Sequence, residues 1–493
     1  MRIGCAYVPS FPLAAWLRAE PELATQAVAV VERPEPRSPV LAASRAAWRW
    51  GVAPGMRLSQ AQSLCRTLVV RPWKLAVLQS AQAALLDAAA ACSPLVEPAD
   101  SGIVYLGLEG LIGSWCASET QWASQLASRC ERLGLPARVA VASTKTAALL
   151  AAQRQEGVTV LAPEEEAEFL APLPVAALQP SAALLATLER WGIHTIGQLV
   201  QLPLQAVGTR LGPEGVALVR RARGEETQPL QPRPCPLVFE ESMEFDYGID
   251  HLEPLAFVLR ALLDRLTARL EARGLACASM QLGLHLSGIG WEERTVAVSY
   301  PNNEAKALLA LLRLHLEQQP PQAALDAVRV RARPEVLRSS QLDLFHPNGP
   351  APASLVAVLA QLSALCGSER VGSPAITPTH RPDGDHWAAF RLHTSGTEHR
   401  PPPNALPPLA LRRFRPPLAV EVFCEREQPD FVRGPGLGGR VVSWAGPWRI
   451  RTEWWNEHPY ERDYYDVQLS DGGVYRLYRD QQQQQWFVDG VYD

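Results

Sequence analysis

The sequence of 493 residues has few of the features that mark a membrane protein, a metalloenzyme or a disulfide-stabilised protein. No apolar run is long enough to cross a bilayer, and the N-terminus lacks the basic, apolar and cleavage-site order of a signal peptide. The nine cysteines are scattered without a C-x-x-C pair, and the ten histidines show no H-E-x-x-H spacing. We therefore expect reduced, mostly buried thiols, no metal site and no cofactor.

The charge of the chain is too balanced for a protein that grips duplex DNA over much of its surface. The formal net charge is −4, with 20% charged and 47% hydrophobic residues, which is typical of a protein with a sizeable core. Lysine occurs only at Lys74, Lys145 and Lys306, so arginine supplies nearly all of the positive charge. Because DNA-binding domains are usually strongly basic, any DNA-binding surface must be local. The length allows three or four domains.

The first third of the sequence predicts a domain of mixed helices and strands. Residues 1–168 alternate strand-like apolar runs, such as Ile3–Val8 and Gly102–Leu108, with Ala-rich helical segments, such as Leu75–Ala91. Ser143 or Thr144 is a candidate N-cap for another helix. This layout indicates an α+β or α/β fold.

A region of short helices follows at residues 169–233. Within it, Trp191–Pro203 has the pattern of a helix-hairpin-helix, in which the backbone N–H groups of Gly192 and Gly197 would bind a phosphate. A simple helical connector explains the same pattern, and the sequence favours neither interpretation.

Residues 234–335 predict a β-α-β-β-α-β domain, the split βαβ arrangement. Its last strand alternates apolar residues with Arg329, Arg331 and Arg333, so the three arginines share one face of the sheet. We interpret them as contacts for DNA phosphates, because no acidic residue interrupts the series. The alternative is a solvated outer face that happens to be basic.

The C-terminal region predicts a partly extended chain and a small β-rich module. Residues 336–350 form a linker, and in the last region, 351–493, residues 401–417 are rich in proline and residues 436–493 are dense in Trp and Tyr. The turn sequence Ser470–Gly473 predicts a hairpin. The aromatic residues form either the core of this module or a docking surface for a partner.

The order of these regions resembles that of the Y-family (translesion) DNA polymerases. Trp50–Arg57 is similar to a segment of their fingers, and Val104–Gly110 is similar to a strand region of their palm. Ser143–Lys145, which precedes an Ala-rich helix, matches another sequence motif of the family, and Trp191–Pro203 is similar to their thumb. The resemblance implies an α+β fold with palm and fingers at 1–168 (the fingers at about 13–74), a helical thumb at 169–233 and a little finger at 234–335. We also regard Lys145 as a candidate DNA contact.

At the positions of that family's catalytic carboxylates, this sequence has other residues. Active members hold two metal ions with an Asp-x-Asp and an Asp-Glu pair, because phosphoryl transfer needs hard carboxylate ligands for magnesium. The first pair falls on Tyr7 and Pro9, and the second pair falls on Gly102 and Ile103. None of these four side chains replaces a carboxylate as a metal ligand, so we expect no polymerase activity.

Other substrate-binding positions depart from the family as well. The bulky residue that screens the sugar aligns with Pro12, and the Tyr and Arg that hold the triphosphate align with Arg45 and Trp48. Asp100 and Glu109 remain nearby, and we expect them in a loop and a turn, since a slip of one residue on a strand reverses its face. An active polymerase with metal ligands relocated to these two acids is the alternative.

A short motif after the last predicted strand indicates docking. Gln341-Leu342-Asp343-Leu344-Phe345 is similar to the clamp-binding pentapeptide of bacteria. Two anchors, Leu344 and Phe345, would fill an apolar pocket, while the Gln341 amide would form hydrogen bonds and Asp343 would stay at the rim. A hydrophobic turn packed on the sheet is the alternative.

A Y-family-like chain without catalytic carboxylates resembles the ImuB family of bacterial inducible mutagenesis cassettes. That resemblance implies a non-catalytic adaptor in error-prone translesion synthesis during the SOS response to DNA damage. Its partners would be the β sliding clamp, an error-prone C-family DNA polymerase, a RecA-like ImuA protein and, weakly, DNA, with no membrane partner. The expected location is cytoplasmic, with association with the nucleoid during DNA damage. A plain DNA-binding module without a clamp role is a further alternative.

Overall fold

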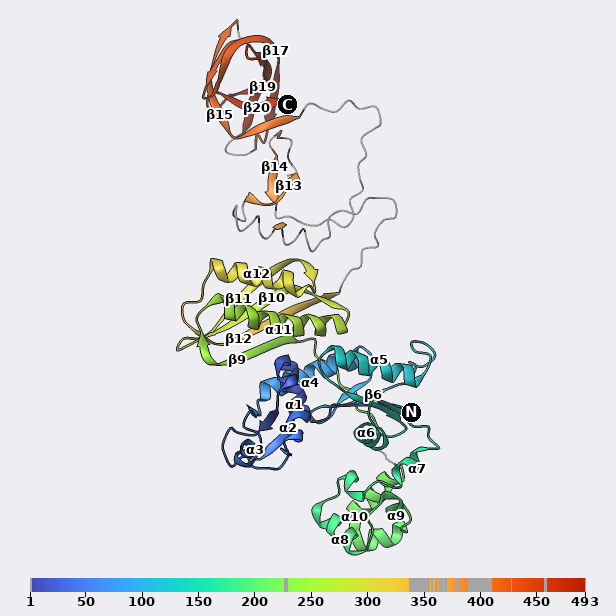
Figure 1. Cartoon of the computed structure of the whole chain (residues 1–493). Coiled ribbons are helices and arrows are strands. Elements are labelled where there is room, and N and C mark those ends of the chain that lie inside the picture. The colour runs from blue at the N-terminus through green and yellow to red at the C-terminus, as the bar shows by residue number, and fades with distance from the viewer. Residues whose placement is uncertain are drawn as a thin grey trace. The chain divides into compact units, whose positions relative to one another are not determined.

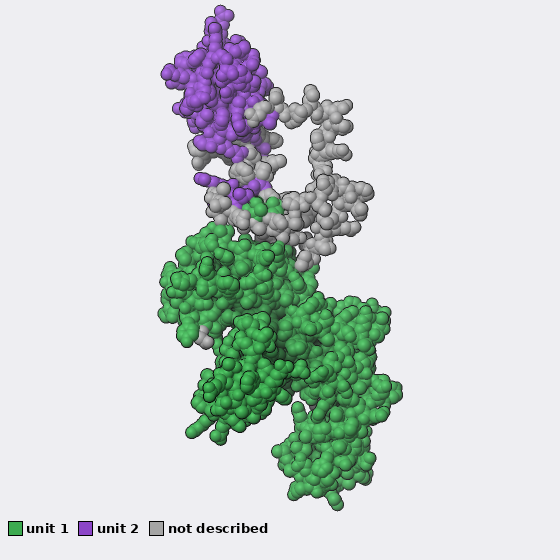
Figure 2. Space-filling model, viewed as in Figure 1, with its two compact units in different colours: residues 1–360 green, residues 361–493 purple. Residues whose placement is uncertain are grey.

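The chain forms two compact units, residues 1–360 and residues 361–493 (Figure 2). The structure, a computed structural model, describes residues 2–225, 229–336, 410–426, 428–455 and 459–492, with scattered residues between 355 and 388. Helices and strands are mixed in the first unit, and strands dominate the second (Figure 1), which confirms the α+β class. Among the described residues, no helix is long and apolar enough to cross a membrane.

The palm is a mixed sheet with helices on both faces. Its strands lie in the order β5 (Val96–Pro98), β6 (Ile103–Gly107), β1 (Ile3–Tyr7), β7 (Arg138–Ala142) and β8 (Val158–Val160). Helices α4 (Leu75–Ala90) and α5 (Glu119–Arg132) cover one face, and α6 (Lys145–Arg154) packs on the other. The Thr144 hydroxyl accepts a hydrogen bond from the Ala147 N–H, so the N-cap of α6 is Thr144 and not Ser143.

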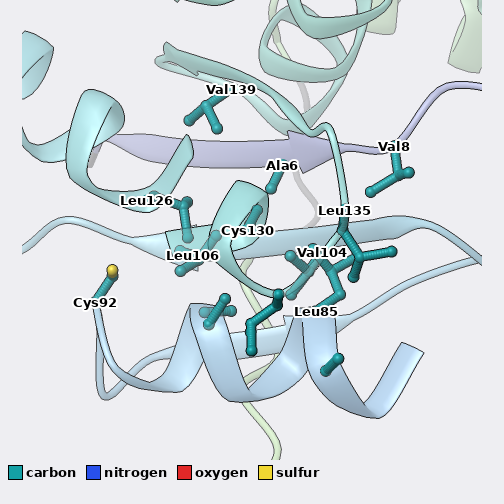
Figure 3. Packing of buried hydrophobic residues seen from close by; sticks show 14 of the residues in the cluster. Ala6, Val8, Leu85, Cys92, Val104, Leu106, Leu126, Cys130, Leu135 and Val139 are labelled. Atoms are coloured by element: carbon teal, nitrogen blue, oxygen red, sulfur yellow. The ribbon is translucent and has the colours of Figure 1, made fainter. Parts of the chain in front are cut away.

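The palm core lies between α4, α5 and the sheet (Figure 3). Leu85 of α4, Leu126 of α5 and Val104 of β6 belong to one cluster and are fully buried. β1 requires glycine at its start, because a Cβ on Gly4 would come within 2.5 Å of the Trp122 ring. β1 therefore packs closely against Trp122 of α5.

The fingers form a small sheet in the order β3 (Val40–Ala43), β2 (Val28–Val31) and β4 (Val69–Pro72). Helix α1 (Phe11–Ala19) and the 3-10 helix η1 (Pro21–Thr25) lead into it, and α1 packs on one face of this sheet. Helices α2 (Arg45–Arg49) and α3 (Leu58–Leu64) pack on the other face.

The thumb is helical, as the sequence predicted. It comprises α7 (Glu166–Leu170), η2 (Val175–Leu178), α8 (Ala182–Arg190), α9 (Ile196–Val200) and α10 (Leu204–Ala222). Leu188 and Leu199 are fully buried between these helices. Within α10, Gly212 takes a φ of +66° immediately before Pro213, and this pair kinks the helix.

The little finger has the predicted β-α-β-β-α-β order. Its elements are β9 (Phe239–Ile249), α11 (Leu252–Ala272), β10 (Leu275–Leu286), β11 (Gly290–Asn302), α12 (Ala305–Gln318) and β12 (Leu325–Val336), and its sheet order is β11-β10-β12-β9. Leucines of both helices share a core with the apolar side chains of β10 and β12, so both helices cover the same face of the sheet.

A buried cluster of charged side chains joins the little finger to α1 and α4. Glu241 of β9 contacts three arginines: Arg18 of α1 at 2.8 Å, and Arg269 and Arg265 of α11 at 3.2 and 3.3 Å. Arg269 also pairs with Asp87 of α4 at 2.7 Å. Burial alone would raise the pKa of the Glu241 carboxyl, but the arginines outweigh burial and lower the pKa to about 2.

The second unit contains a closed barrel of strands. The barrel runs through β15 (Leu411–Glu425), β16 (Gln428–Gly434), β17 (Leu437–Thr452), β18 (Tyr460–Leu469), β19 (Val474–Asp480) and β20 (Gln485–Tyr492), and a separate hairpin pairs β13 (Ser373–Ile376) with β14 (Asp385–Ala388). The β-rich module is therefore confirmed. The hairpin predicted at Ser470–Gly473 is confirmed too, because Gln468 pairs with Val474.

The barrel begins earlier in the chain than the sequence pattern indicates. β15 starts at Leu411, inside the proline-rich stretch 401–417 that predicts an extended linker, and β15 and β16 both precede residue 436. Prolines at positions 416 and 417 fit within this strand because its pairing with β20 is interrupted between Arg413 and Leu418. No N–H is required for the ladder there.

Candidate functional site

The four palm positions singled out in the sequence meet at one end of the palm sheet. Tyr7, the last residue of β1, pairs with Ile103, the first residue of β6. The next N–H along the chain, that of Val8, donates a hydrogen bond to the carbonyl of Gly102 over 2.8 Å. Pro9 follows directly and leads into α1. The side chains brought together here are a phenol, a pyrrolidine ring and a branched alkyl group, and none of these is acidic.

Gly102 has a backbone that suits glycine and no larger residue. Its φ is +83°, in the left-handed region, and a Cβ there would come within 2.8 Å of the Cβ of Phe11. Phe11 is buried at the start of α1, and the Gly102 N–H is held by the Gln82 side chain over 2.8 Å. A carboxylate at position 102 does not fit this conformation.

The two acids of the relocated-site alternative lie in a loop and a turn, as expected. Asp100 is exposed in the bend between β5 and β6, and Glu109 is exposed in the turn after β6, beyond the end of the strand opposite to Ile103. Among the residues that the structure describes, no group of three or more His, Cys, Asp or Glu side chains is arranged to hold a metal ion.

Lys145 does not have the free side chain that a DNA contact requires. Its ammonium group pairs with Glu97 of β5 at 2.8 Å and donates a hydrogen bond to the carbonyl of Pro229 over 3.0 Å. The residue is 8% exposed and its ammonium lies over the Tyr105 ring. Lys145 thus connects the segment after the thumb to the palm through partners that are far from it in the sequence.

The thumb glycines also have internal partners, which corrects the phosphate-binding interpretation of their N–H groups. The N–H of Gly192 donates to the carbonyl of Glu189 over 3.0 Å, and that of Gly197 donates to the carbonyl of Ala171 over 2.9 Å. The side-chain oxygen of Gln198 accepts hydrogen bonds from the N–H groups of His194 and Thr195, the two residues that precede α9. Of the two interpretations left open, this hydrogen bonding favours a helical connector.

The little-finger arginines share one face of β12, as their alternation predicts. Arg331 and Arg333 are exposed, and within the described residues they form no ion pair. Arg329 instead binds Glu293 at 2.6 Å, and its guanidinium lies 4.7 Å from the centre of the Trp291 ring. Two of the three arginines are therefore free to meet a phosphate.

The pentapeptide at 341–345 lies outside the described residues, so its docking role stays a prediction. The aromatic tail divides into two groups. Tyr464, Tyr465 and Tyr478 are buried in the barrel module, as a core would require. Trp454 and Trp455, in the segment between β17 and β18, are 79% and 65% exposed and stand edge to face.

One exposed surface escaped the sequence analysis. Trp48 and Trp50, on and after α2, are 59% and 60% exposed and lie among arginines. From the sequence, Trp50 was recognised only as part of the segment that is similar to the fingers. Trp48 was recognised only as a position where the family has a triphosphate-binding residue. The signal that would have identified them is the complete lack of acidic residues between Glu35 and Asp87.

Two family models match the chain. Residues 6–153, the palm and fingers, match the impB/mucB/samB family, and residues 240–339, the little finger, match the C-terminal domain of the same family. Together these matches span half of the chain. The chain belongs to the impB/mucB/samB family.

Relatives of this impB/mucB/samB member include an ImuB protein and a DNA polymerase. Protein ImuB of Caulobacter vibrioides (strain NA1000 / CB15N) is 28% identical over 467 residues, which cover 90% of this chain and 100% of that protein. DNA polymerase IV of Methanoculleus marisnigri is 29% identical over 317 residues, covering 62% of this chain and 87% of that enzyme. The chain is an ImuB-like homologue of the Y-family DNA polymerases.

A solved structure of DinB from Sulfolobus solfataricus aligns with 68% of this impB/mucB/samB chain and 99% of its own, with 14% identity and a TM-score of 0.42.

Proposed function

We propose that this protein is a non-catalytic adaptor in error-prone translesion DNA synthesis. It would dock on the β sliding clamp and bring an error-prone C-family polymerase and a RecA-like, ImuA-type partner to damaged DNA. The supporting observation is the meeting of Tyr7, Pro9, Gly102 and Ile103 at the ends of β1 and β6. These are the positions where active Y-family enzymes need carboxylates for two metal ions.

Clamp docking is proposed on the pentapeptide Gln341–Phe345. It follows β12, the last strand of the little finger, by only a few residues. Leu344 and Phe345 supply apolar anchors, while ordering a short peptide costs conformational entropy. A lone peptide of this kind should bind with a Kd on the order of micromolar, and further contacts to DNA or partners would raise the overall affinity by avidity.

DNA holding is proposed on the outer face of the little-finger sheet. Arg331 and Arg333 offer guanidinium groups that no described carboxylate pairs with. Two such contacts neutralise few phosphates, so this grip is weak and sensitive to salt. Recruitment of protein partners is proposed on the second unit, where Trp454 and Trp455 are exposed aromatic anchors.

Primer extension with the purified chain tests the absence of catalysis. With a primed template, four nucleotides and Mg²⁺ or Mn²⁺, we expect no templated incorporation. Incorporation that disappears in Asp100→Asn or Glu109→Gln would overturn the proposal and establish the relocated metal site.

Clamp docking is tested separately in the full chain. Changing Leu344 and Phe345 together to Ala should abolish pull-down by the β clamp, whereas changing Asp343 to Ala, at the rim, should leave most of it. Undiminished pull-down by the double variant would show that the pentapeptide does not dock on the clamp. The alternative of a plain DNA-binding module, in which this motif has no docking role, would then be favoured.

A further inference from the structure

The surface of the fingers around α2 combines exposed tryptophans with arginines that pair with no carboxylate among the described residues. We propose that Arg45, Trp48, Arg49 and Trp50 form a binding site for single-stranded DNA, in which bases stack on the two tryptophans and the arginines meet phosphates. This site deepens the DNA-holding part of the proposed function and is independent of clamp docking.

The charge of the fingers is of one sign over a long stretch. Between Glu35 and Asp87 the sequence contains six arginines and one lysine but no acidic residue. Two of these cations are used internally, because Arg71 pairs with Glu20 at 2.6 Å and Lys74 lies 3.5 Å from Glu244. The remaining ones are Arg37, Arg45, Arg49, Arg57 and Arg66; all are exposed, and none forms an ion pair within the described part of the chain.

Helix α2 presents its charged and aromatic side chains together. Arg45, Trp48 and Arg49 are spaced three and four residues apart and therefore share a face, while Ala47 points into the core of the fingers. Trp50 follows at the C-cap, where its N–H donates to the carbonyl of Ala47 over 3.0 Å. The two indoles thus lie within one short, exposed segment.

Hydrogen bonds hold the segment Arg45–Trp50, here called the platform, against the sheet of the fingers. The Ser44 hydroxyl accepts hydrogen bonds from the N–H of Ala47, which caps α2, and from the N–H of Val28 in β2 over 2.9 Å. The same hydroxyl donates to the carbonyl of Gln26 over 3.1 Å. After Trp50 the chain turns at Gly51, whose φ is +80°. A platform that is already ordered loses little entropy when a ligand stacks on it.

Single-stranded DNA fits this chemistry better than an apolar protein surface or a duplex does. An apolar protein surface would gain from the two indoles but would have to desolvate the neighbouring arginines without a compensating charge. A duplex presents phosphates but hides the faces of its bases. A single strand presents both, and stacking contributes about 1–3 kcal/mol per base when measured by alanine substitution.

The location agrees with the altered nucleotide site. By resemblance, Arg45 and Trp48 stand where active Y-family enzymes have the Tyr and Arg that hold the triphosphate. By the same resemblance, this surface lacks the pair of side chains that would hold a triphosphate.

The test measures binding of a fluorescein-labelled dT20 strand to the full-length protein by anisotropy at low salt. The double variant Trp48→Ala/Trp50→Ala should weaken binding about tenfold or more, given the stacking contribution of each ring. Trp48→Phe/Trp50→Phe should restore most of the affinity, because phenyl rings also stack. Arg45→Ala/Arg49→Ala should reduce the dependence of affinity on salt, since fewer counterions are released.

Trp115→Ala is the matched control, because Trp115 is 50% exposed on the palm, outside the fingers. Thermal melting that is unchanged in every variant verifies folding. The proposal is overturned if the Trp48/Trp50 double variant binds dT20 as Trp115→Ala does. It is also overturned if single-stranded and blunt duplex DNA lose affinity equally, or if only pull-down of a protein partner is lost. Clamp pull-down should not change, so failure here leaves the adaptor proposal standing.

Discussion

At position 102, backbone conformation and packing impose the same requirement. The φ of +83° disfavours any side chain, and the buried Phe11 occupies the space that a Cβ would need. The substitution Gly102→Asp therefore should not create a metal ligand, and it should lower the free energy of unfolding by about 2–4 kcal/mol, from left-handed strain and overpacking. Urea denaturation measures this loss.

Ile103→Asp provides the comparison, because Ile103 is only partly buried and lies in an extended strand. Ile103→Asp should lower the free energy of unfolding clearly less than Gly102→Asp does. Equal losses for the two variants would show that the conformation of residue 102 is not the constraint.

The resemblance to the Y-family located the palm positions, because motifs close to them in the sequence anchor the comparison. Tyr7 and Ile103, identified in this way, are paired in the structure. Lys145 and Gly197 were misjudged because their partners, Glu97 and the carbonyl of Ala171, are distant in the chain or belong to another helix. A local pattern shows that a donor exists, but it does not show whether another part of the fold already uses that donor.

At the scale of elements, β9 and α11 are joined to α1 and α4 through the carboxylate of Glu241. Removing that charge leaves Arg18, Arg265 and Arg269 close together without their shared counterion. Glu241→Gln should therefore destabilise the first unit by about 3–5 kcal/mol, as when one partner of a buried pair is removed. Chemical denaturation followed by circular dichroism checks this loss.

Glu244→Gln is a suitable control on the same strand, because the Glu244 side chain is 65% exposed and lies 3.5 Å from Lys74. An exposed pair of this kind contributes less than about 1 kcal/mol. Similar losses for the two variants would mean that the buried cluster does not hold these elements together.

The same carboxylate makes stability depend on acid. The pKa of Glu241 is lowered to about 2 in the fold, against 4.5 for an ordinary glutamate. Its contribution is therefore fully present above the unfolded-state pKa and is lost as the pH falls through the folded-state value. The gap in unfolding free energy between the wild type and Glu241→Gln should narrow by about 3 kcal/mol from pH 5 to pH 2. Equilibrium denaturation at each pH measures the gap, and a constant gap would contradict the lowered pKa.

At the scale of the whole molecule, the two units differ in how well the sequence predicted them. The little finger was predicted element by element because its strands and helices have a clear hydrophobic period and Gly, Asn or Pro residues mark where most of them end. The start of the barrel was misplaced because prolines at 416 and 417 indicate a linker unless an interruption in strand pairing is known. Val432 and Val467 are fully buried in the barrel, so this unit has a core of its own.

The end of the little finger at β12 makes the docking proposal testable by truncation. A chain of residues 1–336 ends with β12, whereas a chain of residues 1–350 adds the pentapeptide to the same folded elements. The longer chain should bind the β clamp with a Kd on the order of micromolar, and the shorter chain should show no measurable binding, because the apolar anchors are missing. Surface plasmon resonance on immobilised clamp measures both, with equal melting temperatures as the control for folding. Clamp binding by the 1–336 chain would place the docking surface on the palm, fingers, thumb or little finger and remove the pentapeptide from the proposal.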